Sequence, residues 1–472
     1  MEMQTEKRTA RMSKGKRRAR LRSLCVAGAV CALVVALVAC APRGEVDPGP
    51  SSEAPPKPQP TAPVAATPTA EKNAAGVWTA EAWKDIYPHE YETYMLNAMN
   101  DTDGNASDPV FEKRGDMVKL YPMLPVIWAG TGFNKFYNEP NGHNYTLDDI
   151  RVSGRVWDAE KGVFKETAFA NCLTCKSADF TALYQQQGNS IFSQPMGEVS
   201  ALLTEPISCF NCHENSLATD AGTGSLAVTQ KFFMEALGSD ADKVDVASQT
   251  CGQCHNEYYF SPADKAPTNP YKGLAQMTPE AMYEYYRTAG KDGTPFVDYT
   301  NPDTGTTQLK TQHPEFEFVF GGAGSSMAGR GYGCADCHMG GEQVADDGTT
   351  YTSHLLISPL ENKELLATSC NMGAGCHTDL ATQVEAWQKA SEDKVMSIGA
   401  KLEDLNKRLA AAVADGSMDE AQLGAVRELN RESQWYWDYV MVENSEGAHN
   451  PKLSDDTLAK SEAAVDKALA LF

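Results

Sequence analysis

Five closely spaced cysteine pairs, each followed at once by histidine or lysine, constrain this chain more than any other feature of its sequence. Of the 13 cysteines, three lie near the N-terminus, and the other ten form pairs that start at Cys172, Cys209, Cys251, Cys334 and Cys370. Disulfides are the default for cysteines of an exported chain, but a disulfide does not require a histidine or lysine beside it. Zinc is disfavoured as well, because zinc-binding pairs need partner pairs at matched spacing.

Three of the pairs have the form C-x-x-C-H, which is typical of covalent haem attachment. Two cysteines three residues apart can form thioether bonds to both vinyl groups of one porphyrin, and the next histidine then ligates the iron. The pair Cys370 and Cys376 resembles a stretched version, in which two glycines let the extra backbone bulge. A haem held only through Cys376, or a disulfide, stays open there. The regular sites are Cys209, Cys212 and His213; Cys251, Cys254 and His255; and Cys334, Cys337 and His338, while His377 follows the stretched pair.

The first pair lies in the stretch NCLTCKS, residues 171–177, where Lys176 follows Cys172 and Cys175 in place of histidine. A lysine binds iron only as the neutral amine, which burial and a nearby metal cation both favour. The alternative is a redox-active disulfide beside a solvent-facing lysine.

A count of the histidines indicates what this lysine is for. The sequence has nine, and four follow cysteine pairs, which leaves His89, His143, His313, His354 and His449. Haems that only transfer electrons are six-coordinate, so four histidine-bound haems need four distal ligands. One histidine is then left over, and the Lys176 iron has no distal ligand assigned to it. Because an iron with an open coordination position can bind a substrate, Lys176 marks the predicted site of chemistry.

The N-terminal region predicts an exported protein. Residues 7–22 carry nine Lys or Arg, and residues 25–39 are almost wholly apolar, as in a secretory signal. Residues 37–40 (LVAC) resemble a bacterial lipobox, in which Cys40 carries lipid after cleavage; an uncleaved membrane anchor is the alternative. Residues 40–76 are rich in Pro, Ala, Ser and Thr, which indicates a tether. The net charge of -22, despite the basic leader, argues against nucleic acid as a partner.

The rest of the chain changes character after His377. Up to that point the pattern is irregular, with short helices predicted, which suits an interior filled largely by porphyrin. Apolar residues then recur at helical spacing, at Val395, Ile398, Leu402, Leu405 and Leu409. This helix is predicted to end at residues 415–416, and a second helix is predicted to begin with a capping box at residues 417–420. A third helix is predicted to begin at residue 454 and to carry Phe472 on its apolar face.

We therefore expect a mainly α multihaem cytochrome c with an irregular haem-packed body and long C-terminal helices. The predicted parts are a leader at residues 1–39, the tether at 40–76, a pentahaem catalytic body at 77–377 and the long helices at 378–472.

Residues 77–472 resemble the pentahaem cytochrome c nitrite reductases, which reduce nitrite to ammonium. The most specific matches are the C-x-x-C-K-S stretch of residues 172–177, CGQCHNEYYF at 251–260 and KTQHP at 310–314. The resemblance implies five covalently bound haem c groups, with His89, His143, His354 and His449 as distal ligands. It implies Lys176, Tyr258 and His313 as catalytic residues. It further implies a calcium ion held by the side chains of Glu257 and Gln312 and the backbone carbonyls of Tyr258 and Lys310, since oxygen ligands of this kind suit calcium.

By the same resemblance, the C-terminal helices form a homodimer interface, and a membrane-bound quinol-oxidising cytochrome donates the electrons. One departure concerns the substrate. The family carries an arginine beside it in a P-R-G-H stretch, where this chain has Asn141. Loss of that cation weakens the capture of an anion, and Arg114, Arg151 and Arg155 are candidates to replace it.

Six-electron reduction of nitrite to ammonium is thus the predicted activity. Two alternatives stay open. An electron-carrier cytochrome explains the haems but not the lysine or the surplus histidine. A reductase of hydroxylamine, sulfite or nitric oxide on the same scaffold is the other.

Overall fold

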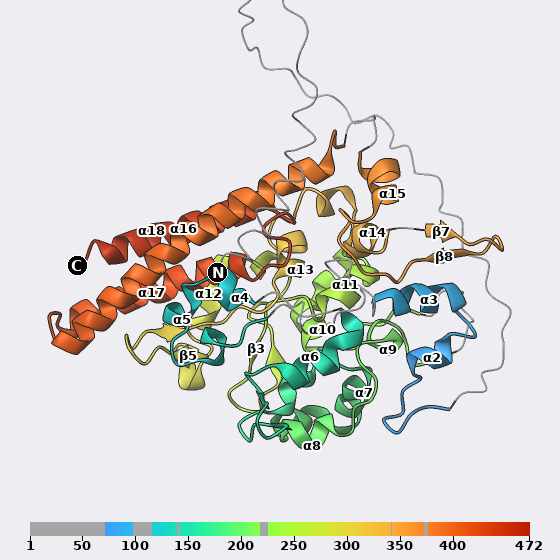
Figure 1. Ribbon diagram of the computed structural model, residues 1–472, viewed down its shortest axis with the longest axis horizontal. Coiled ribbons are helices and arrows are strands. Elements are labelled where there is room, and N and C mark those ends of the chain that lie inside the picture. The colour runs from blue at the N-terminus through green and yellow to red at the C-terminus, as the bar shows by residue number, and fades with distance from the viewer. Residues whose placement is uncertain (1–70, 98–115, 139–141, 218–224, 341, 372–375) are drawn as a thin grey trace, which may run out of the picture. The chain divides into compact units, whose positions relative to one another are not determined.

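A computed structural model describes residues 71–97, 116–138, 142–217, 225–340, 342–371 and 376–472 (Figure 1). The predicted leader, Cys40, most of the tether, Arg114 and Asn141 lie outside these residues. Within them, no helix is long and apolar enough to cross a membrane. The predicted fold class is confirmed: the chain is mostly helical, with short helices followed by three long C-terminal ones (Figure 1).

The body consists of short helices joined by turns. Helices of three to ten residues are marginal on their own in water, so these depend on packing and on capping. Ser177 caps α7 and Asp245 caps α11, each by accepting a backbone N–H of the first turn. The helices are α2 (Ala80–Trp83), α3 (Pro88–Leu96), α4 (Met117–Leu120), α5 (Leu124–Ile127), α6 (Thr146–Val152), α7 (Ala178–Gln187), α8 (Met196–Ser200), α9 (Cys209–Cys212), α10 (Lys231–Leu237), α11 (Val246–Gly252), α12 (Pro279–Tyr286), α13 (Glu315–Phe320), α14 (Cys334–His338) and α15 (Lys363–Leu365).

The strands of the described residues form only small antiparallel pairs, each too short to be stable without the surrounding body. The pair β3 and β4 follows the third cysteine pair, with Tyr259 opposite Thr268, and the pair β5 and β6 has Tyr299 opposite Gln308. The pairs are β1 (Trp157–Asp158) with β2 (Val163–Phe164), β3 (Tyr259–Phe260) with β4 (Pro267–Thr268), β5 (Tyr299–Thr300) with β6 (Thr307–Gln308), and β7 (Glu342–Val344) with β8 (Thr350–Thr352).

The C-terminal helices α16 (Leu380–Asp415), α17 (Glu420–Met441) and α18 (Pro451–Leu469) lie side by side (Figure 1). The predicted apolar stripe of α16 is buried, and α16 ends at Gly416, whose φ of 67° suits glycine. Two predicted starts were wrong. Helix α17 is capped by Asp419, with Gln422 closing the capping box, and α18 starts three residues early because Asn450 caps it ahead of Pro451. Phe472 lies beyond α18 and is exposed.

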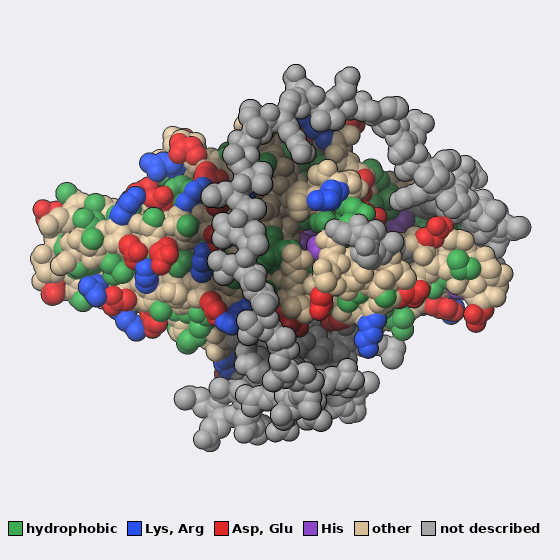
Figure 2. Space-filling view, turned by 90° about the horizontal axis from the view of Figure 1, so that it is seen from above, with side chains coloured by type: hydrophobic (Ala, Val, Ile, Leu, Met, Phe, Trp, Pro, Cys, Tyr) green, Lys and Arg blue, Asp and Glu red, His purple; other side chains and the backbone are tan. Residues whose placement is uncertain are grey.

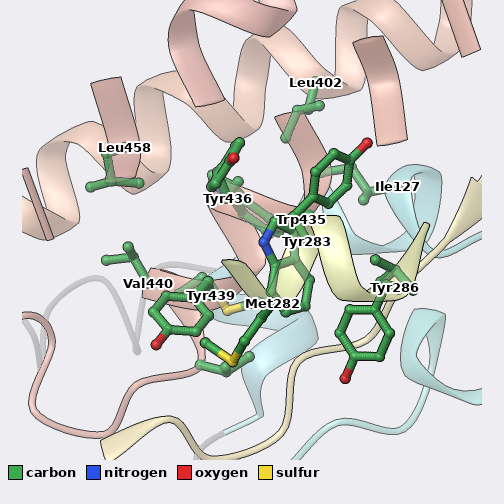
Figure 3. Close-up of a cluster of buried hydrophobic side chains, with 14 of the residues drawn as sticks. Ile127, Met282, Tyr283, Tyr286, Leu402, Trp435, Tyr436, Tyr439, Val440 and Leu458 are labelled. Carbon is green, nitrogen blue, oxygen red and sulfur yellow. The ribbon is translucent and has the colours of Figure 1, made fainter. Parts of the chain in front are cut away.

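The long helices join the body through α17. Its residue Trp435 packs against Tyr283 and Tyr286 of α12 in the cluster of Figure 3, and the Trp435 indole N–H donates to the carbonyl of Pro279 at 3.0 Å. Acidic and basic side chains are interspersed over the surface of the long helices (Figure 2). Burial of aromatic side chains therefore helps to hold α17 against the body.

Candidate multihaem active site

The ten cysteines of the five pairs form no disulfide with one another in the structure. We name the pairs with their following residues the first to fifth attachment segments, at residues 172–176, 209–213, 251–255, 334–338 and 370–377. The first begins within the 3-10 helix Ala170–Leu173 and leads into α7; the second and fourth coincide with α9 and α14; the third begins at the end of α11. The fifth begins at the end of the π-helix Leu366–Cys370, and its residues 372–375 lie outside the described part.

The third segment lies between the first and the fourth. Cys175 of the first is hydrogen-bonded to Cys254 of the third, a contact that lowers the pKa of Cys175 and raises that of Cys254. Cys251, at the other end of the third segment, is hydrogen-bonded to Cys334 and raises its pKa. Groups attached at neighbouring sulfurs would lie close together, as electron transfer between them requires.

Histidines distant in sequence are brought together in pairs. The ring centroids of His213 and His354 lie 6.1 Å apart, those of His338 and His449 6.0 Å, and those of His143 and His255 6.5 Å. An imidazole binds a metal at about 2.0 Å, so an iron held between two imidazole nitrogens places the ring centroids roughly 6 Å apart. The three pairs therefore fit an iron between them.

The second ring nitrogen of the predicted ligand histidines supports the same interpretation. The Nδ1 atoms of four of them lie within 3.0 Å of an acceptor, namely His338 with the Ile357 carbonyl, His354 with the Thr352 carbonyl, His377 with Gln383 Oε1 and His449 with Glu443 Oε1. A fifth, His255, faces Glu315 Oε2 at 3.4 Å. Metal-binding histidines commonly donate one ring N–H in this way, which leaves Nε2 free to bind the metal.

The remaining two predicted ligands have other neighbours in the residues that the structure covers. His89, on α3, stacks on Tyr351 at 5.1 Å, and its Nε2 lies 3.7 Å from Asp347 Oδ2. His377 lies next to the long helix α16, whose Gln383 holds it. The pairing of His89 with His377 therefore stays a prediction.

Hydrogen bonds of Thr146 connect Lys176 to the chain segment that carries His143. The Thr146 hydroxyl donates to the Lys176 carbonyl at 2.7 Å and lies 3.0 Å from the His143 carbonyl. Burial, with smaller effects of His255 and Lys176, lowers the pKa of His143 to about 4. His143 is therefore neutral near pH 7, the form that binds a metal.

The other two predicted catalytic residues lie in the same region. The His313 ring lies 6.2 Å from His255, and its buried Nδ1 has no hydrogen-bond partner among the described residues. Burial lowers the pKa of His313 to about 4, and Lys176 is one of the cations that lower it further. Burial also raises the pKa of Tyr258, with the thiols of Cys175 and Cys172 adding to the rise. The structure thus places Tyr258 and His313 around the first and third segments.

Three of the four predicted calcium ligands meet at Glu257, which is completely buried. Glu257 Oε2 accepts the Gln312 backbone N–H at 2.7 Å, Oε1 accepts the Tyr286 hydroxyl at 2.9 Å, and the Gln312 side-chain amide lies 3.1 Å from the Lys310 carbonyl. Burial raises the pKa of Glu257 well above its ordinary value. A buried carboxyl beside an amide and a carbonyl is a set of hard oxygen ligands, and a bound Ca²⁺ would compensate its charge.

Glu317 is part of this site, although no sequence motif pointed to it. Its Oε1 accepts the Glu257 backbone N–H at 2.9 Å. Burial raises the pKa of Glu317 to about 8, although a hydrogen bond with Tyr271 opposes the rise. A second buried carboxyl beside Glu257 adds to the oxygen ligands that suit a cation.

Helix α17 holds the loop that leads to Gln312 and His313. Side chains on successive turns of α17 bind residues 304–311 in order, so the loop runs in register along the helix. Asp438 closes the series, because its carboxylate accepts the Lys310 ammonium at 2.9 Å and the Thr311 backbone N–H at 2.9 Å. The earlier contacts are Arg427 to Thr304, Asn430 to Thr306, Arg431 to Thr307 and Gln434 to Leu309, at 2.8 to 3.1 Å.

Of the three arginines that could replace the missing cation, two are described. Arg151 is 3.7 Å from Asp148 and is thus paired. The Arg155 guanidinium lies 4.5 Å from the Phe133 ring centroid, and its charge offsets part of the burial that raises the pKa of Cys172. Arg155 is therefore the candidate that lies within electrostatic reach of the first segment.

Comparisons with known proteins agree with this geometry. The sequence profile described as cytochrome c552 matches residues 79–472. Curated relatives named cytochrome c-552 include that of Desulfotalea psychrophila, 31% identical over 416 residues and covering 82% of this chain and 73% of the relative. That of Bacteroides thetaiotaomicron is 31% identical over 412 residues, covering 83% and 77%.

Among solved structures, the catalytic subunit of the cytochrome c nitrite reductase from Desulfovibrio desulfuricans superposes with a TM-score of 0.69. It is 28% identical, the match covers 83% of this chain and 85% of that one, and that protein has two calcium sites. The chain therefore belongs to the cytochrome c552 family.

Proposed function

We propose that the chain is a cytochrome c nitrite reductase that reduces nitrite to ammonium with six electrons at an iron bound by Lys176. The observation that carries this proposal is the position of Tyr258 and His313 beside the first attachment segment, where lysine replaces histidine. The match to a nitrite reductase of Desulfovibrio desulfuricans supports the same activity. When bound, the haem of the first segment would supply an iron with one free coordination position.

The other four segments would carry electron-transfer haems, because each provides a histidine and the chain provides distal partners. The geometry supports His213 with His354, His255 with His143 and His338 with His449. His377 and His89 remain for the fifth segment. The contact between Cys175 and Cys254 supports the third segment as the immediate source of electrons for the first.

His313 and Tyr258 would handle the substrate and its protons. The pKa of about 4 keeps the His313 imidazole neutral near pH 7, so it holds one N–H that can donate to a substrate oxygen. The raised pKa of Tyr258 keeps its hydroxyl protonated, and it can donate as well. Both residues then act as hydrogen-bond donors, and solvent must replace each proton that they transfer.

Arg155 would supply the positive charge that Asn141 lacks. The chain is strongly acidic, so an anion needs a local cation near its binding site. Among the charge contacts that the structure covers, Arg155 is paired with an aromatic ring and not with a carboxylate, which leaves its charge available.

A calcium ion would bind at Glu257, Gln312 and the carbonyls of Lys310 and Tyr258, and would hold the loop that carries His313. The support is the buried, uncompensated carboxyl of Glu257 and the two calcium sites of the Desulfovibrio desulfuricans protein.

The remaining expectations complete the proposal. Export, through a signal or an anchor at residues 1–39 with lipid on Cys40, follows from the sequence alone. So do dimerisation through α16, α17 and α18 and reduction by a membrane-bound quinol-oxidising cytochrome.

The experiment is steady-state turnover of the purified holoprotein with a reduced dye as donor and nitrite, hydroxylamine, sulfite or nitric oxide as acceptor. We expect nitrite to give the highest kcat/KM of the four acceptors. Ammonium should be the product, with six electrons consumed for each nitrite. His313→Gln should retain all haem yet lose most nitrite turnover. Nitrite turnover unchanged in His313→Gln contradicts the role of His313, and no turnover with any acceptor favours the electron-carrier alternative.

A further inference from the structure

Directly after α17 the chain folds around one buried carboxylate, that of Glu443. Its side chain is fully buried, and both oxygens are hydrogen-bonded. Oε2 accepts the Ser445 hydroxyl at 2.6 Å and the Gly447 N–H at 3.0 Å. Oε1 accepts the Ser445 N–H at 3.1 Å and lies 2.6 Å from His449 Nδ1. The loop of residues 443–449 therefore holds an anionic oxygen on the ring of His449.

The other short contacts at histidine Nδ1 have neutral acceptors. His338, which faces His449 at 6.0 Å, contacts the Ile357 carbonyl, and His354 contacts the Thr352 carbonyl. His377 contacts the amide oxygen of Gln383. His255 has a carboxylate neighbour, but the distance of 3.4 Å to Glu315 is long for a hydrogen bond. The contact of His449 is thus both charged and short.

A carboxylate acceptor makes an imidazole a stronger electron donor, because the N–H proton is drawn toward the anion. A stronger donor stabilises ferric over ferrous iron, and hydrogen bonds to axial ligands are one of the levers that set haem potentials. Burial prevents water from screening the Glu443 charge.

We propose that Glu443 is a positioning residue that, through His449, lowers the reduction potential of the iron held by the fourth attachment segment. The inference rests on the proposed function only in that this segment carries a haem with His338 and His449 as ligands.

The fourth segment is also the neighbour of the third, through the contact between Cys251 and Cys334. An iron of low potential there does not retain electrons for long. Glu443 therefore favours the passage of electrons toward the third segment over their storage at the fourth.

The test is a redox titration of the intact holoprotein without nitrite, followed by optical and paramagnetic spectra. In Glu443→Gln, one haem should shift to a more positive potential, by about tenfold or more in its one-electron equilibrium constant, which corresponds to about 59 mV. Glu420→Gln removes a carboxylate that pairs with Arg427 at the exposed start of α17, and it should shift no potential.

Ser445→Ala provides a test of opposite sign. It removes the hydroxyl that donates to Glu443 at 2.6 Å, so more negative charge faces His449 and the same haem should shift to a more negative potential. If Glu443→Gln does not retain its haems, the Ser445→Ala titration decides.

Unchanged potentials in Glu443→Gln with full haem content, or a shift in the negative direction, overturn the inference. An unchanged or more positive potential in Ser445→Ala does the same. Nitrite turnover is measured separately, so a shifted haem in a protein inactive toward nitrite refutes the proposed reaction and leaves the inference intact.

Discussion

The buried ion pair between Lys310 and Asp438 offers a quantitative test of how α17 positions the catalytic loop. The side chains are 3% and 0% exposed, and the Lys310 ammonium lies 2.9 and 3.0 Å from the two carboxylate oxygens. Lys310→Met removes the cation and leaves Asp438 buried with the Thr311 N–H as its remaining donor. Breaking a buried pair from one side costs about 3–5 kcal/mol, because the other charge stays without compensation.

The same change should impair catalysis. Lys310 lies two residues before Gln312, whose N–H binds Glu257, and three before His313. Loss of the anchor loosens both, so we expect weaker calcium binding and a lower kcat for nitrite. The free energy of unfolding is measured by urea titration of the calcium-loaded holoprotein, and calcium affinity by isothermal calorimetry.

Two controls separate burial from charge. Lys407→Met breaks an exposed pair with Glu403 on α16, where the lysine is 61% exposed, and it should cost less than about 1 kcal/mol. The double variant Lys310→Met/Asp438→Leu removes both buried charges and should be more stable than Lys310→Met alone. A cost below about 1 kcal/mol for Lys310→Met, with unchanged calcium affinity, refutes the reasoning.

Three further predictions concern the cation, the anion and the haems. Burial raises the pKa of Glu317 to about 8 in the calcium-free protein, so Glu317 is protonated at pH 7. Calcium binding should therefore release protons, and the affinity for calcium should rise as the pH increases toward 8. Calorimetry in buffers of different ionisation enthalpy measures this proton release. Without calcium, the same raised pKa means that the neutral Glu317 adds stability at low pH, and this stability is lost as the pH rises through about 8. A calcium-free protein that becomes more stable over that range contradicts the raised pKa of Glu317. Arg155→Ala should raise the KM for nitrite about tenfold at low salt and much less at high salt, with little change in kcat, whereas an equal effect at both ionic strengths argues against charge attraction. The intact mass of the holoprotein should show five haems. If Cys376 alone holds the fifth haem, Cys370→Ser should keep all five, and its mass should differ only by the substitution itself.

The haem architecture could be predicted from the sequence because its motifs are local. A cysteine pair and its following histidine or lysine occupy five consecutive residues in four of the five segments, so spacing alone reveals them. The surplus of one histidine could likewise be counted. Which histidines face each other could not be predicted, since His213 and His354 lie 141 positions apart and meet only when the chain between them has folded.

The residues that support the site were missed for a different reason. Asp438 and Gln434 are polar residues with no motif to mark them, yet both are buried, because they bind the backbone of residues 309–311 instead of water. Glu317 and Glu443 carry no motif either. Their roles depend on a backbone N–H or a ring nitrogen brought to them from elsewhere in the fold.

Helix starts show the same limit on a smaller scale. Ser417 was a reasonable cap for α17, but Asp419 provides the stronger reciprocal bond with Gln422. Such choices differ by about 1 kcal/mol or less, which local patterns do not resolve.

The most direct test of the central claim is whether one iron of the oxidised holoprotein, the one bound by Lys176, accepts an external ligand. Addition of nitrite, followed by optical and electron paramagnetic resonance spectra, should change the signal of one haem and leave the bis-histidine haems unaltered. Lys176→His should shift the spectrum of that same haem. If every iron is already six-coordinate and no added ligand perturbs any of them, the account is wrong and the protein only carries electrons.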